Sequence, residues 1–400
     1  MIQISQLMKL NIIKFKSTFF LILISFSYLS FSQNNDKLTL GADQIEFFID
    51  DLKGKNVAIV ANQTSKIKSN KKHVHIIDSL LSLNINVKKV FSPEHGFRGI
   101  ADAGEKVEDG IDLKTGLPII SLHGSNKKPT INQMKDIDVV IFDIQDVGVR
   151  FYTYISTLHL VMEAVAENNK KLIILDRPNP NGHYIDGPIL ENNFKSFVGM
   201  HPIPIVHGMT IGELGIMINK EGWLKNKINC DLKVIPIENY DRNIIYDLPE
   251  KPSPNLPNKK SINLYPSLCL FEQTPISIGR GTEMQFQIIG NPDWKKTDFK
   301  FKPKSMSGAK SPKHLNEICN GIDLRNSPLL NEINLEWIIY AYNKSKNKTS
   351  FFRSGFNRLA GNDKLKEQII NGLSEKEIKL SWKKGIENFK SIRSKYLLYN

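Results

Sequence analysis

The chain has 400 residues and a formal net charge of +13 at pH 7. This length is too great for one ordinary hydrophobic core and predicts two domains. The lysines are spread singly and in pairs, and no basic helix is interleaved with aromatic residues, so the charge argues against nucleic acid as a partner.

The N-terminus has the pattern of a secretory signal. Three lysines precede an apolar run at residues 19–29, and small residues follow at 30–32. The run is too short to span a bilayer and lacks a stop-transfer flank, which favours a cleaved signal peptide at residues 1–32 over a retained anchor. Loss of the three lysines leaves a charge of +13 − 3 = +10. We expect an exported protein, periplasmic or secreted, without stable membrane insertion after cleavage.

Five apolar runs of strand length follow, and each ends in polar or ionisable residues: 56–61, 87–91, 117–122, 139–142 and 172–175. Continuous apolar runs separated by helix-length segments predict strands that are buried on both faces of a parallel sheet. Ligands of such sheets bind outside the carboxyl ends of the strands. The polar residues after each run are therefore expected to line one crevice.

Helical patterns at 74–83, at 153–168 and from 210 alternate with these strands, and 231–237 predicts one more strand. The fold class is therefore α/β. We predict a Rossmann-like, mostly parallel sheet domain at 39–240, followed by a smaller α/β domain at 241–400 that closes the active-site cleft.

A proline-rich segment at 248–257 lies at the junction of the two predicted domains. Such a run forms neither a helix nor a central strand. It is either a linker or an ordered wall of the cleft. We favour the wall because the polar residues Ser253 and Asn255 alternate with the prolines.

Several enzyme classes lack their expected signature. The turn at 62–65 has no glycine, the pair Gly279 and Gly281 is not followed by a third glycine, and the chain has neither a Walker A sequence nor a G-x-S-x-G elbow. Three scattered cysteines and the lack of C-x-x-C and H-E-x-x-H spacings give little support to a disulfide scaffold or a zinc site. We predict no cofactor and no metal.

Carboxylates remain as candidates for the chemistry. Glu94 follows a strand and a stiffening proline, where partial burial would raise its pKa as a general acid requires; the alternative is a glutamate that caps a helix. Glu272 is a second candidate, with an ion pair to an arginine as the equal alternative. Asp143 and Asp146 frame a tight turn and could instead satisfy its backbone donors.

Cations and histidines accompany these carboxylates. Arg150 and Arg280 lie in loops near the predicted cleft, where arginine suits bidentate recognition of a carboxylate, although one of them could brace a protein carboxylate instead. His95, His123 and His207 each precede a glycine. A single such histidine is usually a hydrogen-bonded core residue, whereas three in the same setting indicate a polar pocket.

An ordered series of motifs resembles the exo-β-N-acetylmuramidase family, which was long catalogued as a domain of unknown function. The matching motifs are S-P-E-H-G-F-R-G at 92–99, D-I-Q-D-V-G-x-R-F-Y-T-Y at 143–154, L-D-R-P-N-P at 175–180, H-G-M-T-x-G-E at 207–213, P-S-P-N-x-P at 252–257 and G-R-G-T at 279–282. The similarity covers essentially the whole mature chain. Gln273 and residues 283–285 depart from the family pattern, which predicts a different rim of the pocket.

This resemblance implies a peptidoglycan glycosidase that releases N-acetylmuramic acid from the non-reducing end of muramyl glycans, with the proposed catalytic glutamate at Glu94. The candidate catalytic residues are Glu94, Glu272 and Asp143. The expected substrate-binding residues are His95, Arg98, Asp146, Arg150, Tyr154, Asn179, His207 and Arg280.

The chemistry of the substrate sets further requirements. Its lactyl carboxylate calls for a cation, which Arg150 or Arg280 could supply. Its hydrolysis needs a proton donor and a group that handles the anomeric carbon, with carboxylates about 5 Å apart in retaining enzymes and about 6.5–9.5 Å apart in inverting ones. The 2-acetamido group could itself be the nucleophile, oriented by Asp143 or Asp146.

The alternatives to a glycosidase are a non-catalytic periplasmic binding protein for muramyl sugars and a cell-wall esterase or amidase. The sequence does not determine the oligomeric state.

Overall fold

The computed structural model describes residues 38–69, 72–94, 96–97 and 109–400. The predicted signal peptide, His95 and Arg98 lie outside the described residues. The chain divides into two units, Met1–Leu38 and Thr39–Asn400, and the second unit contains all the elements below.

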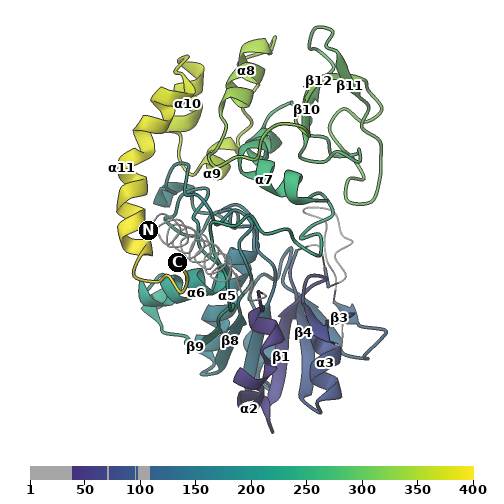
Figure 1. Ribbon diagram of the computed structural model, residues 1–400, viewed down its shortest axis with the longest axis vertical. Helices are drawn as coiled ribbons and strands as arrows, with labels where there is room; N and C mark the ends of the chain where they lie inside the picture. The colour runs from purple at the N-terminus through teal and green to yellow at the C-terminus, as the bar shows by residue number, and fades with distance from the viewer. Residues whose placement is uncertain (1–37, 70–71, 95, 98–108) are drawn as a thin grey trace, which may run out of the picture. The chain divides into compact units, whose positions relative to one another are not determined.

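A seven-stranded sheet with the order β5-β6-β4-β1-β7-β8-β9 forms the centre of the N-terminal domain (Figure 1). All neighbouring strands are parallel except β5 and β6. This confirms the α/β class and the mostly parallel sheet. The strands are β1 (Asn56–Ala61), β4 (Asn86–Ser92), β5 (Gly110–Ile111), β6 (Pro118–Ser121), β7 (Val139–Asp143), β8 (Lys171–Leu175) and β9 (Asp231–Ile235).

Both faces of the sheet are covered, which explains why the central strands β1, β7 and β8 are almost continuously apolar. Along β1, Val57 and Ile59 belong to one hydrophobic cluster, whereas Ala58 and Val60 belong to another. The side chains of a strand alternate between its faces, so the two clusters are the two sides of the sheet. The helices of this domain are α2 (Ile49–Leu52), α3 (Ile76–Ser82), α4 (Ile131–Met134), α5 (Tyr154–Glu167) and α6 (Ile211–Lys220), with 3-10 turns η1 (Gly41–Asp43), η2 (Ile45–Phe47), η3 (Asn192–Phe194) and η4 (Lys225–Lys227).

One boundary differs from the sequence prediction. A small antiparallel hairpin, β2 (Lys66–Ser69) and β3 (Lys72–His75), follows β1, so the helix expected from residue 74 begins only at Ile76. The side chain of His75 accepts a hydrogen bond from the backbone N–H of Ile77 and caps α3.

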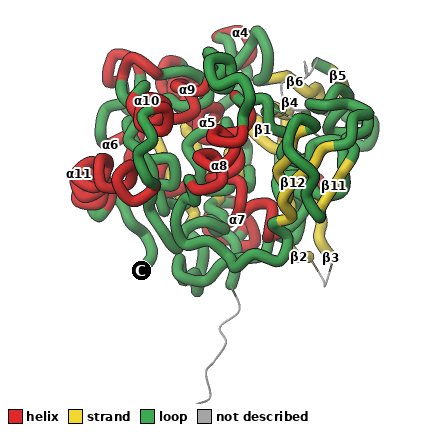
Figure 2. The backbone as a smooth tube through the Cα atoms, turned by 90° about the horizontal axis from the view of Figure 1, so that it is seen from above, coloured by secondary structure: helices red, strands yellow, loops and turns green. Residues whose placement is uncertain are grey.

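The C-terminal domain combines a three-stranded antiparallel sheet with helices. Its strands are β10 (Ile288–Asn291), β11 (Phe299–Phe301) and β12 (Cys319–Asp323), in the order β10-β12-β11. Its helices are α7 (Lys259–Leu268), α8 (Glu336–Lys344), α9 (Phe356–Ala360), α10 (Lys364–Ile370) and α11 (Glu375–Arg393), with η5 (Cys269–Gln273) after α7. Figure 2 shows α10 and α11 on one side of this domain, β11 and β12 on the other, and α7 and α8 between them.

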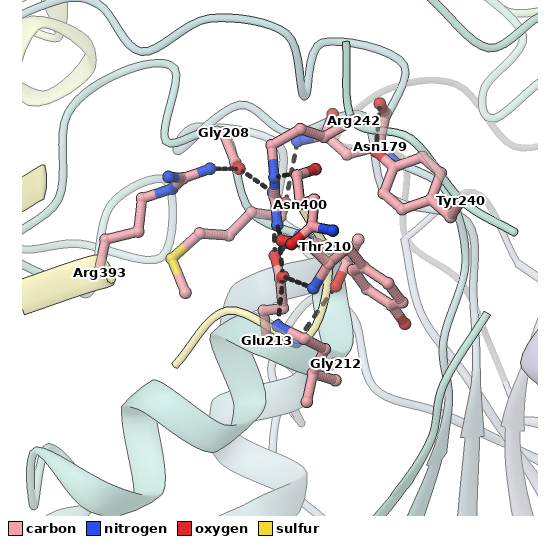
Figure 3. A network of polar contacts seen from close by, with 12 residues as sticks. Asn179, Gly208, Thr210, Gly212, Glu213, Tyr240, Arg242, Arg393 and Asn400 are labelled. Carbon is pink, nitrogen blue, oxygen red and sulfur yellow. Dashed lines mark hydrogen bonds and ion pairs between the residues drawn. The ribbon is translucent and has the colours of Figure 1, made fainter. Parts of the chain in front are cut away.

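The last three residues, 398–400, return to the N-terminal domain and form what we term the C-terminal clasp. Glu213, at the start of α6, accepts hydrogen bonds from the backbone N–H of Leu398 (2.8 Å) and from Arg242 (2.7 Å). Arg242 in turn donates to the carbonyls of Tyr399 (2.6 Å) and Asn400 (3.1 Å) (Figure 3). Glu213 and Arg242 are both buried. The clasp therefore rests on a buried ion pair.

The clasp also reaches the carboxyl end of β8. The Tyr399 hydroxyl donates to Asp176 Oδ2 (2.6 Å) and accepts from the backbone N–H of Ile237 (2.8 Å). Burial raises the pKa of Asp176 to about 6, although hydrogen bonds from Tyr399, Thr210 and Gly212 act in the opposite direction. The end of β8 is thus filled by protein.

Replacing Tyr399 by Phe removes one of the donors that stabilise the buried carboxylate of Asp176. We expect the free energy of unfolding to fall by roughly 1–3 kcal/mol. The loss should be greater at pH 8 than at pH 5, because the missing bond raises the pKa of Asp176 further and penalises its charged form. Urea denaturation at both pH values measures this. Tyr340→Phe, at a partly exposed position, is the control, and equal losses at the two pH values would contradict the assignment.

Candidate active site

A cavity of about 240 Å³ lies between the two domains, and both domains supply its walls. The N-terminal domain contributes Glu94, the run 151–154 and Val198. The proline-rich segment contributes Ser253, Asn255 and Leu256, which confirms that it forms a wall. The other lining residues are Tyr265, Cys269, Glu272, Gln273, Arg280, Phe286 and Leu359.

Glu94 is placed by the end of β4, which closes at Ser92 and leads into Pro93. The hydroxyl of Thr153 donates to Glu94 Oε2 at 2.7 Å. Thr153 is the N-cap residue of α5, a helix of 14 residues. The carboxylate of Glu94 therefore lies near the positive end of a helix dipole. Glu94 is half-buried and lines the cavity, so it is accessible to a ligand.

Two tyrosines connect this strand-end loop to the proline-rich wall. The hydroxyls of Tyr152 and Tyr154 donate to the carbonyl of Pro252 at 2.8 and 3.3 Å. Asn62, just after β1, donates to the Tyr154 hydroxyl at 2.9 Å. Burial raises the pKa of both tyrosines well above the usual range, so both phenols are neutral donors at ordinary pH.

Glu272 occupies a cationic part of the wall. Arg280 donates to Glu272 Oε1 at 2.7 Å and lies over the ring of Phe286. Burial alone would raise the pKa of Glu272, but the charges of Arg280, Lys313 and Arg353 outweigh it and lower this pKa. Glu272 is therefore ionised at neutral pH and holds no proton to give. The structure shows the ion pair that was the alternative to a catalytic role.

This cluster carries more positive than negative charge. It holds three cations, Arg280, Lys313 and Arg353, around the single carboxylate of Glu272, which gives a net charge of +3 − 1 = +2 when Lys313 is protonated. Burial lowers the pKa of Lys313 to about 8, which leaves it largely protonated at neutral pH. Of these cations Arg280 lines the cavity, where it suits an anionic group on a ligand.

Arg150, expected to bind substrate, performs a structural function instead. Its side chain is fully buried, and it does not line the cavity. Its guanidinium donates to four backbone carbonyls, those of Pro188 (2.7 Å), Ile203 (2.8 Å), Leu359 (3.0 Å) and Ala360 (2.8 Å). The two terminal nitrogens are thus used by the backbone, whereas Nε is buried and has no hydrogen-bond partner among the described residues.

Asp143, expected to be catalytic, is equally committed to the protein. Both of its carboxylate oxygens accept from Arg177, at 2.6 and 3.0 Å, and both residues are buried. Asp146 is buried as well. Its Oδ2 accepts from the backbone N–H of Gly148 at 2.7 Å, whereas its Oδ1 has no hydrogen-bond partner among the described residues. Neither aspartate lines the cavity.

The structure places two further expected contacts away from the cavity. Asn179 is buried and donates to the carbonyl of Met209 at 2.9 Å. His207 accepts from the backbone N–H of Met209 at 3.2 Å, and burial lowers its pKa to about 3, so it is neutral. Of the expected site residues that the structure describes, those that line the cavity are Glu94, Glu272, Tyr154 and Arg280.

Several lining residues were not expected from the sequence. Thr153 and Tyr152 lie inside the aromatic motif that contains Tyr154, so the motif could have drawn attention to them. Phe286 and Tyr265, whose ring centroids lie 5.0 Å apart, belong to no comparable sequence motif. Among the described residues, no group of three or more His, Cys, Asp and Glu side chains could hold a metal ion. No helix in the described part of the chain is both long and apolar enough to cross a membrane.

Comparisons with known proteins find matches over most of the chain. Residues 57–260 match the N-terminal model of the exo-β-N-acetylmuramidase NamZ, and residues 263–399 match its C-terminal model. The chain is 40% identical over 370 residues to the peptidoglycan β-N-acetylmuramidase NamZ of Bacillus subtilis (strain 168), covering 87% of this chain and 88% of the relative.

Two crystal structures of DUF1343 family proteins from Bacteroides fragilis NCTC 9343 share this fold. The first, at 1.30 Å resolution, is 48% identical with a TM-score of 0.84. The second, at 1.65 Å resolution, is 28% identical with a TM-score of 0.75. Each comparison covers 91% of this chain and 99% of the other chain.

Replacing Asp146 by Asn tests its buried, protonated state. Burial raises the pKa of Asp146 to about 7, against backbone hydrogen bonds from Gly148 and Val147 that lower it. Because the folded pKa exceeds the unfolded value, the stability that the bound proton contributes is complete at low pH and is lost as the pH rises toward 7. The Asn variant has no proton to lose at this position. We expect its free energy of unfolding, relative to that of the wild type, to be higher at pH 8 than at pH 5 by roughly 2–3 kcal/mol.

Urea denaturation at the two pH values measures the difference. The exposed Asp363 provides the control variant Asp363→Asn. If the Asp146→Asn variant and the wild type changed in parallel with pH, Asp146 would be ionised in the folded protein and this assignment would fail.

Proposed function

Because the chain belongs to the exo-β-N-acetylmuramidase NamZ family of glycoside hydrolases, we propose that it releases N-acetylmuramic acid from the non-reducing end of peptidoglycan fragments. The observation that carries the proposal is that Glu94 and Arg280 line the same cavity. A neutral sugar offers Arg280 no anionic group to bind. The lactyl group of N-acetylmuramic acid supplies the missing carboxylate.

Glu94 is the proposed general acid, which protonates the leaving oxygen of the scissile bond. It is held by Thr153, whose hydroxyl donates to Glu94 Oε2, and it lines the cavity that a ligand would enter. Glu272 does not share this role, because its cationic neighbours keep it ionised. We assign it to holding Arg280, which is the proposed contact for the lactyl carboxylate.

The anomeric carbon needs a second group. Glu94 and Glu272 are the carboxylates among the described residues that line the cavity. Since Glu272 is bound to Arg280 and Asp143 to Arg177, we assign this step to the 2-acetamido group of the substrate. Its carbonyl oxygen would attack the anomeric carbon as Glu94 releases its proton to the leaving oxygen.

Export completes the proposal. A secretory signal at residues 1–32 would bring the enzyme to the compartment where peptidoglycan lies. The binding-protein alternative shares the cavity and the charge, so turnover alone separates it from the enzyme.

Replacing Glu94 by Gln should lower kcat on a chromogenic β-N-acetylmuraminide by about 10²–10⁴-fold, because the amide cannot give a proton to the leaving oxygen. Binding of N-acetylmuramic acid, measured by calorimetry, should change little. Glu283→Gln, at an exposed position near the cavity loop, is the control and should retain full activity. Near-normal turnover in the Glu94 variant would remove Glu94 from the acid role, and a wild type that binds without turnover would favour the binding-protein alternative.

Replacing Arg280 by Met should lower kcat/KM on muraminides by roughly 10–100-fold and change the activity on glucosaminides little, because the two sugars differ in the lactyl ether. Arg325→Met, at an exposed position outside the cavity lining, is the control and should leave the preference for muraminides unchanged. If Arg280→Met left the muraminide-to-glucosaminide ratio unchanged, the lactyl carboxylate would have to be bound elsewhere.

A further inference from the structure

Asn255 lines the cavity, and its side chain carries a buried hydrogen-bond acceptor without a partner among the described residues. The residue lines the cavity and is only 2% exposed. Its Nδ2 donates to the carbonyl of Gly308 at 2.7 Å, which fixes the orientation of the amide. Its Oδ1 is buried and has no hydrogen-bond partner among the described residues. Buried polar atoms are usually satisfied, so an orphan acceptor beside a cavity points to a ligand that supplies the donor.

The wall that carries this acceptor is held from several sides. Tyr152 and Tyr154 both donate to the carbonyl of Pro252. The backbone N–H of Asn255 donates to the hydroxyl of Ser253 at 3.3 Å. A Cβ at Gly308 would lie 2.6 Å from Pro254 Cβ, so that loop packs tightly against the segment. Asn255 Oδ1 is therefore fixed in place before a ligand arrives.

The substrate offers one group that matches this acceptor. Sugar hydroxyls donate and accept, so they can be satisfied in several orientations. The N–H of a 2-acetamido group only donates, and burying it without an acceptor is costly. Glu272 already faces three cations, whereas Asn255 Oδ1 is neutral and has no partner in the described part of the chain. An amide oxygen can accept this N–H without adding a charge to the cavity.

We propose that Asn255 is the positioning residue for the 2-acetamido group of the substrate and accepts its N–H through Oδ1. This inference rests on the proposed function and replaces Asp143 and Asp146, whose side chains do not line the cavity. Holding the N–H would orient the acetamido carbonyl toward the anomeric carbon. It would also stabilise the positive charge that the amide nitrogen acquires when that carbonyl attacks.

The test is an amide-to-ester replacement in the ligand combined with two variants of Asn255. The ligands are N-acetylmuramic acid and its 2-O-acetyl analogue, which lacks only the N–H donor, and their Kd values are measured by calorimetry. Asn255→Asp keeps an acceptor and loses the donor to Gly308. Asn255→Leu loses both. The difference between the variants therefore isolates the acceptor from the structural bond to Gly308.

In the wild type we expect the ester to bind about 10- to 100-fold more weakly than the amide. The Asp variant should keep this preference, and the Leu variant should bind both ligands equally. On a muraminide substrate, kcat of the Leu variant should fall by a larger factor than KM changes, which a purely structural role would not produce. Asn255→Ala replaces the Leu variant if thermal unfolding shows that the latter does not fold.

Two outcomes would overturn the inference while leaving the proposed function intact. One is equal binding of the ester and the amide by the wild type. The other is an undiminished preference for the amide in the Leu or Ala variant, provided that the wild type turns over muraminides. A wild type that neither binds N-acetylmuramic acid nor turns over muraminides would overturn the proposed function, and this inference with it.

Discussion

The buried guanidinium of Arg150 is the contact on which the geometry of the cavity depends. It bonds carbonyls at 188 and 203 in the N-terminal domain and at 359 and 360 in the C-terminal domain. The residues that follow it directly, 151–154, line the cavity, and so does Leu359. One side chain thus fixes both walls relative to each other. Four carbonyls held by a charged donor constitute a strong constraint, because leaving any of them unpaired in the interior is costly.

Within that frame, two glutamates of one cavity have opposite environments. Glu94 is bonded by the neutral hydroxyl of Thr153, whereas Glu272 is surrounded by cations that keep it charged. Divergent environments of this kind separate the roles of two carboxyl groups in one site. The cationic surroundings of Glu272 suit electrostatic binding of a substrate. Glu94 accepts a hydrogen bond from a neutral hydroxyl and lines the cavity, so it remains the candidate for proton transfer.

Local patterns in the sequence were sufficient to predict the parallel sheet, the proline-rich wall and the place of Glu94. Each depends on residue types within one strand or one turn, such as the apolar run before Pro93. The roles of Arg150 and Asp143 could not be predicted in this way, because both are ionisable residues at the end of a buried strand or in the loop that follows it, as Glu94 is. Their partners lie 34 to 210 residues away in the chain. The role proposed for Asn255 could not be predicted from the sequence, because only the folded structure shows that its Oδ1 has no partner among the described residues.

The carboxyl edge of the sheet shows why strand-end polarity alone does not identify catalytic residues. Every buried strand ends in backbone and side-chain polar groups that must be satisfied. At the end of β7, Asp143 is satisfied by Arg177, and at the end of β8, Asp176 is satisfied in part by Tyr399 of the C-terminal clasp. The end of β4 differs, because Glu94 lies beside a cavity. Protein groups occupy the ends of β7 and β8 and thereby stabilise the fold, whereas the end of β4 borders a cavity that a ligand can enter. A polar residue at a strand end is therefore a candidate for the chemistry where it also lines the cavity, and Asn255 of the facing wall lines the same cavity.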